Sequence, residues 1–102
     1  MNPIRHGDIV LYPAPPIDTS QFEPIAGNSL ATGSSTGHSH SVTPASAVSQ
    51  FDLGDERRLL VLTSPAELSH DEHTTVQLDT GYYIVSHKRQ YDADNGWVDV
   101  ED

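Results

Sequence analysis

Cysteine is absent from this sequence of 102 residues. The chain therefore has no disulfide framework and no thiolate to serve as a nucleophile or a metal ligand. No stretch approaches the roughly 18 consecutive apolar residues of a membrane span. The N-terminal residues also lack the apolar segment of a signal peptide. We expect a protein that is made in the cytoplasm and is not secreted by that route.

Positive charge is scarce. Five Lys and Arg residues stand against fifteen Asp and Glu residues, which gives a formal net charge of −10 at pH 7. Binding to nucleic acid depends on clustered cations that displace counterions from phosphates, so we expect no nucleic-acid partner. An anionic membrane surface is disfavoured for the same reason. The charge favours simple solubility or a basic protein surface as the partner.

Apolar residues make up only 35 % of the chain, which indicates a thin hydrophobic core. Because such a domain gains stability from association, we expect a homo-oligomer or a docking surface. No apolar pattern with the 3.6-residue period of a helix extends over about ten residues. Short strand-forming segments alternate instead with turn signals. We predict a single all-β domain over residues 1–102, a jelly-roll-like β-sandwich or barrel of about seven or eight short strands.

The clearest strand candidates are two continuous apolar runs, at residues 9–12 and 59–62. Runs of this kind are typical of strands that are buried on both faces. Residues 48–53 alternate between apolar and polar side chains, as a half-buried strand does. The glycine and acidic residues at 54–56 predict a turn between the strand at 48–53 and the strand at 59–62.

Three prolines follow the first apolar run: Pro13, Pro15 and Pro16. Proline has no N–H to donate to a sheet ladder, so these residues predict the end of the strand. We expect a proline-rich arm or loop over residues 13–24.

Four of the six histidines fall in two short segments. Residues 36–42 read Thr-Gly-His-Ser-His-Ser-Val, and residues 70–73 read His-Asp-Glu-His. His38 and His40 would project from one face of a strand about 7 Å apart, near enough to bind one ion. The three-residue spacing of His70 and His73 fits a turn or a bulge better than a straight strand.

If folding brings the two pairs together, the imidazoles predict a site for a divalent metal, either zinc or else iron or nickel. The predicted ligands are His38, His40, His70 and His73. Asp71 and Glu72 would supply further oxygen ligands or hydrogen-bond acceptors. The alternative is a histidine cluster that is held by hydrogen bonds without an ion. Both alternatives are open at this point.

The order of these motifs resembles that of a family of small, largely uncharacterised proteins of bacteria and their phages. Its members open with a Gly-Asp strand and then carry Thr-Gly-His-x-His, His-x-x-His, Gly-x-Tyr and Arg-x-Tyr segments. The corresponding residues here are Gly7-Asp8, Thr36 to His40, His70 to His73, Gly81 to Tyr83 and Arg89 to Tyr91. The resemblance covers most of the chain and implies no particular activity.

The expected architecture is also similar to the cupin and jelly-roll group, whose enzymes hold a metal with a His-x-His pair. That resemblance implies a metal site at His38 and His40. The cupin motif continues with a glutamate three or four residues beyond the second histidine, where this sequence has Thr43 and Pro44. The resemblance therefore concerns the fold more than oxygenase or isomerase chemistry.

The first functional hypothesis is a non-enzymatic structural protein, most like a phage capsid cement or decoration protein. The histidines would then stabilise the fold or a subunit contact, and a phage-encoded chain would be part of the virion. The sequence has no Ser/His/Asp order typical of a triad and no glycine loop followed by Lys, which favours this hypothesis.

The alternative is a cupin-like metal-binding protein or a metal-dependent enzyme, in which Glu72 would act as a general base on a metal-bound water. A third hypothesis is a pH-responsive module, because several histidines in an acidic chain would gain protons near pH 6–7.

Overall fold

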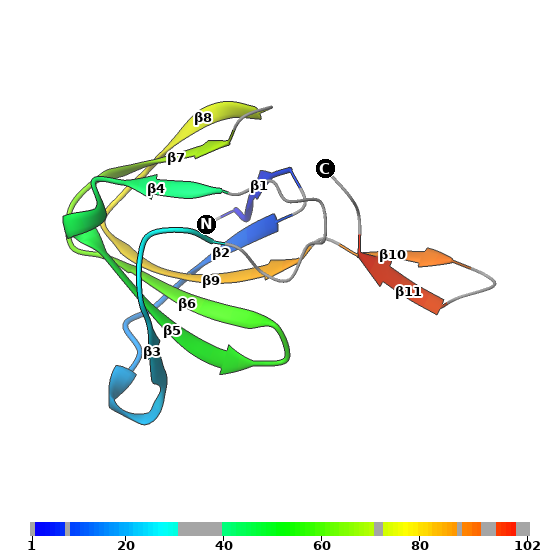
Figure 1. Cartoon of the computed structure of the whole chain (residues 1–102), viewed down its shortest axis with the longest axis horizontal. Coiled ribbons are helices and arrows are strands. Elements are labelled where there is room, and N and C mark those ends of the chain that lie inside the picture. Colours follow the sequence, from blue (N-terminus) through cyan, green and yellow to red (C-terminus); the bar gives the residue numbers. More distant parts are fainter. Residues whose placement is uncertain are drawn as a thin grey trace.

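The chain folds into two packed antiparallel β-sheets, which Figure 1 shows as a ribbon. The computed structural model describes residues 2–7, 9–30, 40–70, 73–87, 89–92 and 96–99. No helix in these ranges is long and apolar enough to cross a membrane. The all-β sandwich predicted from the sequence is confirmed.

The larger sheet has six strands in the order β1-β2-β9-β6-β5-β3, and the smaller has three in the order β4-β7-β8. A separate hairpin, β10–β11, extends to the right in Figure 1. The strands are β1 (Ile4–His6), β2 (Ile9–Ala14), β3 (Glu23–Ile25), β4 (Ser41–Thr43), β5 (Val48–Gly54), β6 (Arg57–Leu62), β7 (Ala66–His70), β8 (His73–Leu78), β9 (Gly81–His87), β10 (Arg89–Asp92) and β11 (Gly96–Asp99). Two 3-10 turns, η1 (Thr19–Gln21) and η2 (Ala45–Ala47), lie between strands.

The described residues form more strands than the roughly seven or eight that the sequence suggested. The excess comes mainly from β1, β3 and β4, which have three residues each. A strand of that length is too short to show an alternating pattern, so sequence periodicity does not reveal it.

The hydrophobic core lies between the two sheets. Ile9 and Leu11 of β2 point into it and are 1 % and 0 % exposed. Leu60 of β6 belongs to the same cluster, and Leu68 of β7 meets it from the smaller sheet. Complete burial of one such side chain stabilises the fold by about 1.5–3 kcal/mol. The two apolar runs therefore supply the centre of the sandwich.

The opposite face of the six-stranded sheet, called the outer face from here on, is apolar as well. Val10 and Leu59 alternate with the core residues of β2 and β6, and they are 4 % and 0 % exposed although they lie outside the core cluster. The strand register places Leu59 between Phe51 of β5 and Ile84 of β9. Tyr12, opposite Ile84, is 44 % exposed. Apart from Tyr12, the residues of the two apolar runs are thus buried or half-buried on both faces, as their sequence indicated.

Pro13 does not end β2, contrary to the sequence prediction. The strand continues to Ala14, and Pro13 pairs in register with Tyr83 of β9. On its other side β2 is paired with β1 only over residues 9–11, so position 13 has one neighbouring strand. Such a position tolerates a residue without an N–H donor. The loop expected at 13–24 is correspondingly shorter, because its last residues form the edge strand β3.

Tyr83 gives a test of the core. Its side chain is 6 % exposed, and its hydroxyl donates to the carbonyl oxygen of Asp79 at 2.8 Å. Burial raises the pKa of Tyr83 above its usual 10.0, and the charge of Asp79 adds to the rise. The unfolded chain therefore loses this proton first. The contribution of the protonated Tyr83 to the free energy of unfolding is therefore complete below the usual pKa of tyrosine. It is lost as the pH rises through the raised pKa of Tyr83 in the folded protein.

We expect Tyr83→Phe to lower the free energy of unfolding by about 1 kcal/mol near neutral pH, because one hydrogen bond is lost. The variant should also lose less stability than the wild type as the pH rises above about 10. Urea unfolding over a pH series measures both effects, with the half-buried Tyr82→Phe as the control. Identical pH slopes for wild type and Tyr83→Phe would contradict the expectation.

Candidate functional site

Three buried histidines meet where the two sheets approach each other. His6 ends β1, His40 directly precedes β4, and His70 ends β7; their side chains are 4 %, 3 % and 9 % exposed. The ring centroids of His40 and His70 are 4.4 Å apart, and that of His6 lies 5.0 Å from His40 and 6.2 Å from His70. Figure 1 shows β1 beside the ends of β4 and β7. The cluster therefore connects the larger sheet to the smaller one.

The pairing of β4 with β7 explains why His40 and His70 meet. Ser41 lies opposite Ser69 in this antiparallel ladder. In such a ladder, the residue before one partner lies beside the residue after the other. His40 and His70 hold those two positions. Two backbone hydrogen bonds, from Leu30 N to His40 O (2.7 Å) and from Val42 N to Asn28 O (3.0 Å), fix the approach to β4.

His6 reaches the cluster through the β1–β2 hairpin. It pairs directly with Ile9, whose side chain is part of the core. Directly opposite residues in a sheet project from the same face, so His6 also points toward the interior. The sequence prediction missed this residue because it stands alone, outside any histidine pair. The signal that would have found it is its place across a two-residue turn from a buried strand.

A hydrogen bond joins the two sheets at this point, with Nδ1 of His6 and Nδ1 of His40 2.9 Å apart. One nitrogen must donate and the other must accept, so at least one of the two rings carries no proton at Nδ1 and is neutral. The ring of His6 stands edge-on to both others, at interplanar angles of 69° and 81°. Three polar rings thus pack inside the protein as a unit rather than as isolated groups.

The predicted site residues have different outcomes. His40 and His70 lie together, as the sequence analysis required. His73 begins β8 and its backbone pairs directly with His70, with a register shift between Leu68 and His70. The expectation of a turn or bulge at this spacing is therefore confirmed. His38 lies outside the described residues, as do Asp71 and Glu72.

The fit of a metal ion can be judged from the donor set. Imidazole nitrogens suit zinc, iron and nickel. Two such nitrogens on one tetrahedral zinc ion lie about 3.4 Å apart, which follows from bonds of about 2.0–2.1 Å. The Nδ1 atoms of His6 and His40 are closer, at 2.9 Å, because a hydrogen bond joins them. Within the described ranges, no three His, Asp or Glu side chains are already arranged to hold an ion. A metal would therefore require the rings to separate and turn.

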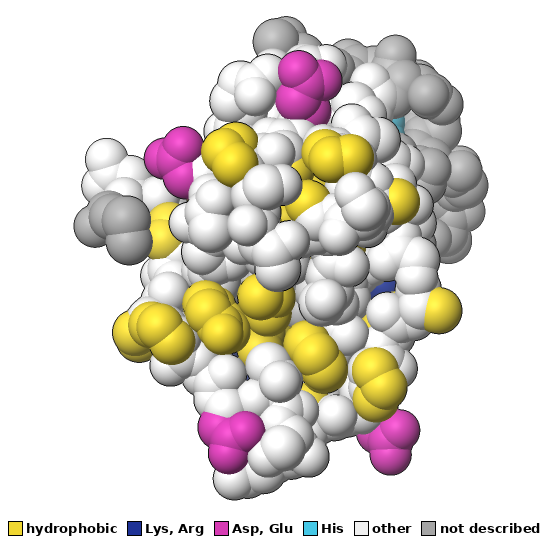
Figure 2. Space-filling model, turned by 90° about the vertical axis from the view of Figure 1, so that its left-hand side faces the viewer, with side chains coloured by type: hydrophobic (Ala, Val, Ile, Leu, Met, Phe, Trp, Pro, Cys, Tyr) yellow, Lys and Arg dark blue, Asp and Glu magenta, His cyan; other side chains and the backbone are white. Residues whose placement is uncertain are grey.

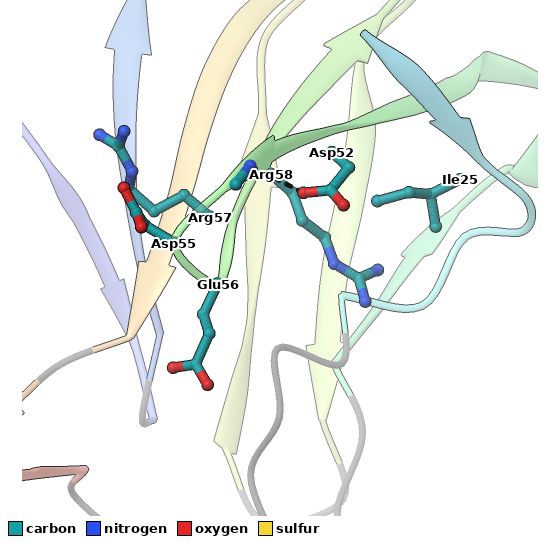
Figure 3. A pocket seen from close by; sticks show the side chains of 7 residues that line it. Ile25, Asp52, Asp55, Glu56, Arg57 and Arg58 are labelled. Carbon is teal, nitrogen blue, oxygen red and sulfur yellow. Dashed lines mark hydrogen bonds between the residues drawn. The ribbon is translucent and has the colours of Figure 1, made fainter.

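A surface pocket of about 370 Å³ lies at the turn between β5 and β6. Its backbone is unusual, because Gly54, Asp55 and Glu56 have φ angles of 79°, 53° and 62° in succession. Figure 3 shows the side chains of Arg57 and Arg58 pointing in different directions from this turn. The lining residues are Ile25, Asp52, Gly54, Asp55, Glu56, Arg57 and Arg58.

Arg58, which lines that pocket, forms hydrogen bonds that stabilise the fold. Its Nη1 donates to Ser29 O and to Gln50 Oε1, at 3.3 Å each. Burial lowers the pKa of Arg58, and the nearby charge of Asp52 opposes that change. Arg58 therefore ties the segment before β4 to the six-stranded sheet. Another pocket, of about 420 Å³, is lined by residues of β1, β2, β8 and β9 and the turn before β9. Neither of these two pockets is lined by a histidine.

Comparison with known protein families shows which family this chain belongs to. Residues 5–88 match the model of a family described as "Domain of unknown function (DUF8820)", and the chain belongs to that family. The match runs from β1 to the end of β9 and so includes His6, His40 and His70. Comparison with curated proteins and with solved structures gave no match.

Removal of His6 tests the cluster as a source of stability. We expect His6→Ala to lower the free energy of unfolding by about 1–3 kcal/mol, because it leaves a buried nitrogen of His40 without this hydrogen bond. Arg5→Ala is the matched control on the same strand, since Arg5 is exposed and surface changes usually cost less than about 0.5 kcal/mol. Urea unfolding gives both values. Equal losses for the two variants would show that the contact contributes little.

Proposed function

We propose that this member of the DUF8820 family is a non-enzymatic structural protein whose histidine cluster clamps its two sheets together and binds a divalent transition metal. The observation that carries the proposal is the convergence of three buried imidazoles from both sheets, with His6 and His40 already in hydrogen-bond contact. Zinc is the preferred ion, with iron and nickel as alternatives, because all three accept imidazole ligands.

The position of the cluster supports a clamp. His6 belongs to the six-stranded sheet, whereas His40 directly precedes β4 and His70 ends β7 in the three-stranded sheet. An ion bound by rings from both sheets would contribute its binding free energy to the association of the sheets. A thin core gains most from such a contribution. His38 and His73, the other two predicted ligands, are close along the chain to His40 and His70.

Zinc titration tests this proposal. We expect the chain to bind about one zinc ion and to gain about 2.7 kcal/mol of stability when free zinc is 100-fold above its dissociation constant. His40→Gln should lose most of this gain, because an amide can replace the hydrogen bond but is a poor zinc ligand. Isothermal titration calorimetry gives the stoichiometry, and thermal unfolding with and without zinc gives the gain.

The matched control is Gln50→Ala. Gln50 is 1 % exposed and donates to Gly27 O and Ser29 O at 3.0 Å each, so its loss destabilises the fold while every imidazole of the cluster is kept. This variant should keep its full response to zinc. The proposal fails if wild-type protein binds no ion and zinc, iron and nickel all leave its unfolding temperature unchanged.

We also propose that the protein works by attachment to a larger protein assembly, as phage capsid cement proteins do. The outer face supports this role, because Tyr12 is 44 % exposed there, and Phe51 and Ile84 on the same face are partly exposed. Figure 2, a view from the left-hand side of Figure 1, shows that further hydrophobic side chains reach the surface, with acidic side chains above and below them. Neighbouring apolar side chains that are exposed on a strongly acidic chain are typical of a contact region.

Co-sedimentation with purified phage capsids tests attachment. We expect the wild-type chain to travel with capsids in a sucrose gradient and Tyr12→Lys to remain at the top, because a charge at the centre of an apolar contact must be desolvated. Ser46→Lys carries the same net charge and places the lysine at an exposed position in η2, so it should bind like the wild type. If all three proteins stay at the top, the chain has no capsid affinity.

A further inference from the structure

The two sheets have four edge strands, and three of them are poorly suited to pairing. An edge strand offers unpaired backbone donors and acceptors to any strand that approaches, unless it is short, charged, interrupted by proline or covered. β1, β3 and β4 have three residues each. β3 also carries Glu23 and Pro24, and β4 is already bridged by Ser29 at Ser41.

β8 differs from the other edges in each respect. It has six residues, without proline and without Asp, Glu, Lys or Arg. Within the described part of the chain it is paired with β7 alone, and it forms the upper border of the molecule in Figure 1. Leu78 is buried and Val76 packs against the core, so the strand is held in place, whereas Thr75 and Gln77 are exposed.

The charge of the chain limits where a second copy can approach. Two copies with a net charge of −10 each repel one another over most of their surfaces. β8 itself contains no Asp, Glu, Lys or Arg, although Glu67 of β7 and Asp79 lie beside it, so two copies can approach along β8 with less opposition from charge than along β3, which carries Glu23. Consecutive β-branched residues, Thr74, Thr75 and Val76, favour an extended conformation there.

We infer that β8 is a contact between two copies of this chain, in which the two β8 strands pair antiparallel about a two-fold axis. Such a contact is isologous, because each strand meets its own equivalent. It would join the two small sheets into one continuous sheet in the order β4-β7-β8-β8-β7-β4. One added ladder buries little area, so the dimer should be weak and should be strengthened by salt that screens the repulsion.

Sedimentation equilibrium of the full chain, with EDTA present to remove metal-bridged species, tests this contact. We expect a monomer–dimer equilibrium whose dissociation constant falls as sodium chloride is added. Thr75→Lys should raise the dissociation constant at least about fivefold, because it brings like charges together across the axis. Thr43→Lys is the matched control: it adds the same charge at an exposed threonine on the opposite edge of the same sheet, and it should behave like the wild type.

Hydrogen exchange gives a second reading that needs no variant. Amides of β8 in the wild-type chain should become more protected as the protein concentration rises through the dissociation constant, whereas those of β3 should not change. A wild-type chain that stays monomeric at millimolar concentration and high salt overturns the inference. So does a dimer that the two lysine variants weaken equally, because the contact would then lie elsewhere. Neither result depends on zinc or capsid binding.

Discussion

The contact between His6 and His40 is the constraint on which the candidate site depends. Each ring lies in the protein interior, where a polar atom without a partner costs about 1–3 kcal/mol, and each supplies the other's partner. The two rings can form this hydrogen bond only when both sheets are in place, since they come from different sheets. The site is therefore a product of the assembled sandwich and has no counterpart in either sheet alone.

Features encoded within a few neighbouring residues were predictable from the sequence. The apolar runs at 9–12 and 59–62 became the central strands β2 and β6, because hydrophobic patterning acts locally. The residues at 54–56 form the turn expected of them. The meeting of His40 with His70 was also anticipated, since both belonged to recognisable pairs next to predicted strands.

Features that depend on strand neighbours were not predictable. Pro13 stays within β2 because β1 is too short to pair beside it, and no local pattern reports the length of a neighbouring strand. His6 enters the site because a tight hairpin places it across from Ile9. A lone histidine carries no spacing, so its role follows from sheet register rather than from its own segment.

The length of β1 has a consequence for how the cluster is reached. One of the three rings sits on a three-residue strand at the border of the larger sheet, paired along one side only. Such strand ends open at far lower free energy than a core strand does. Since His6 is the ring that this strand contributes, a local opening of β1 would withdraw one imidazole and leave His40 and His70 in place on the smaller sheet. Hydrogen exchange at the cluster is therefore expected to follow the stability of β1 more closely than that of the core strands.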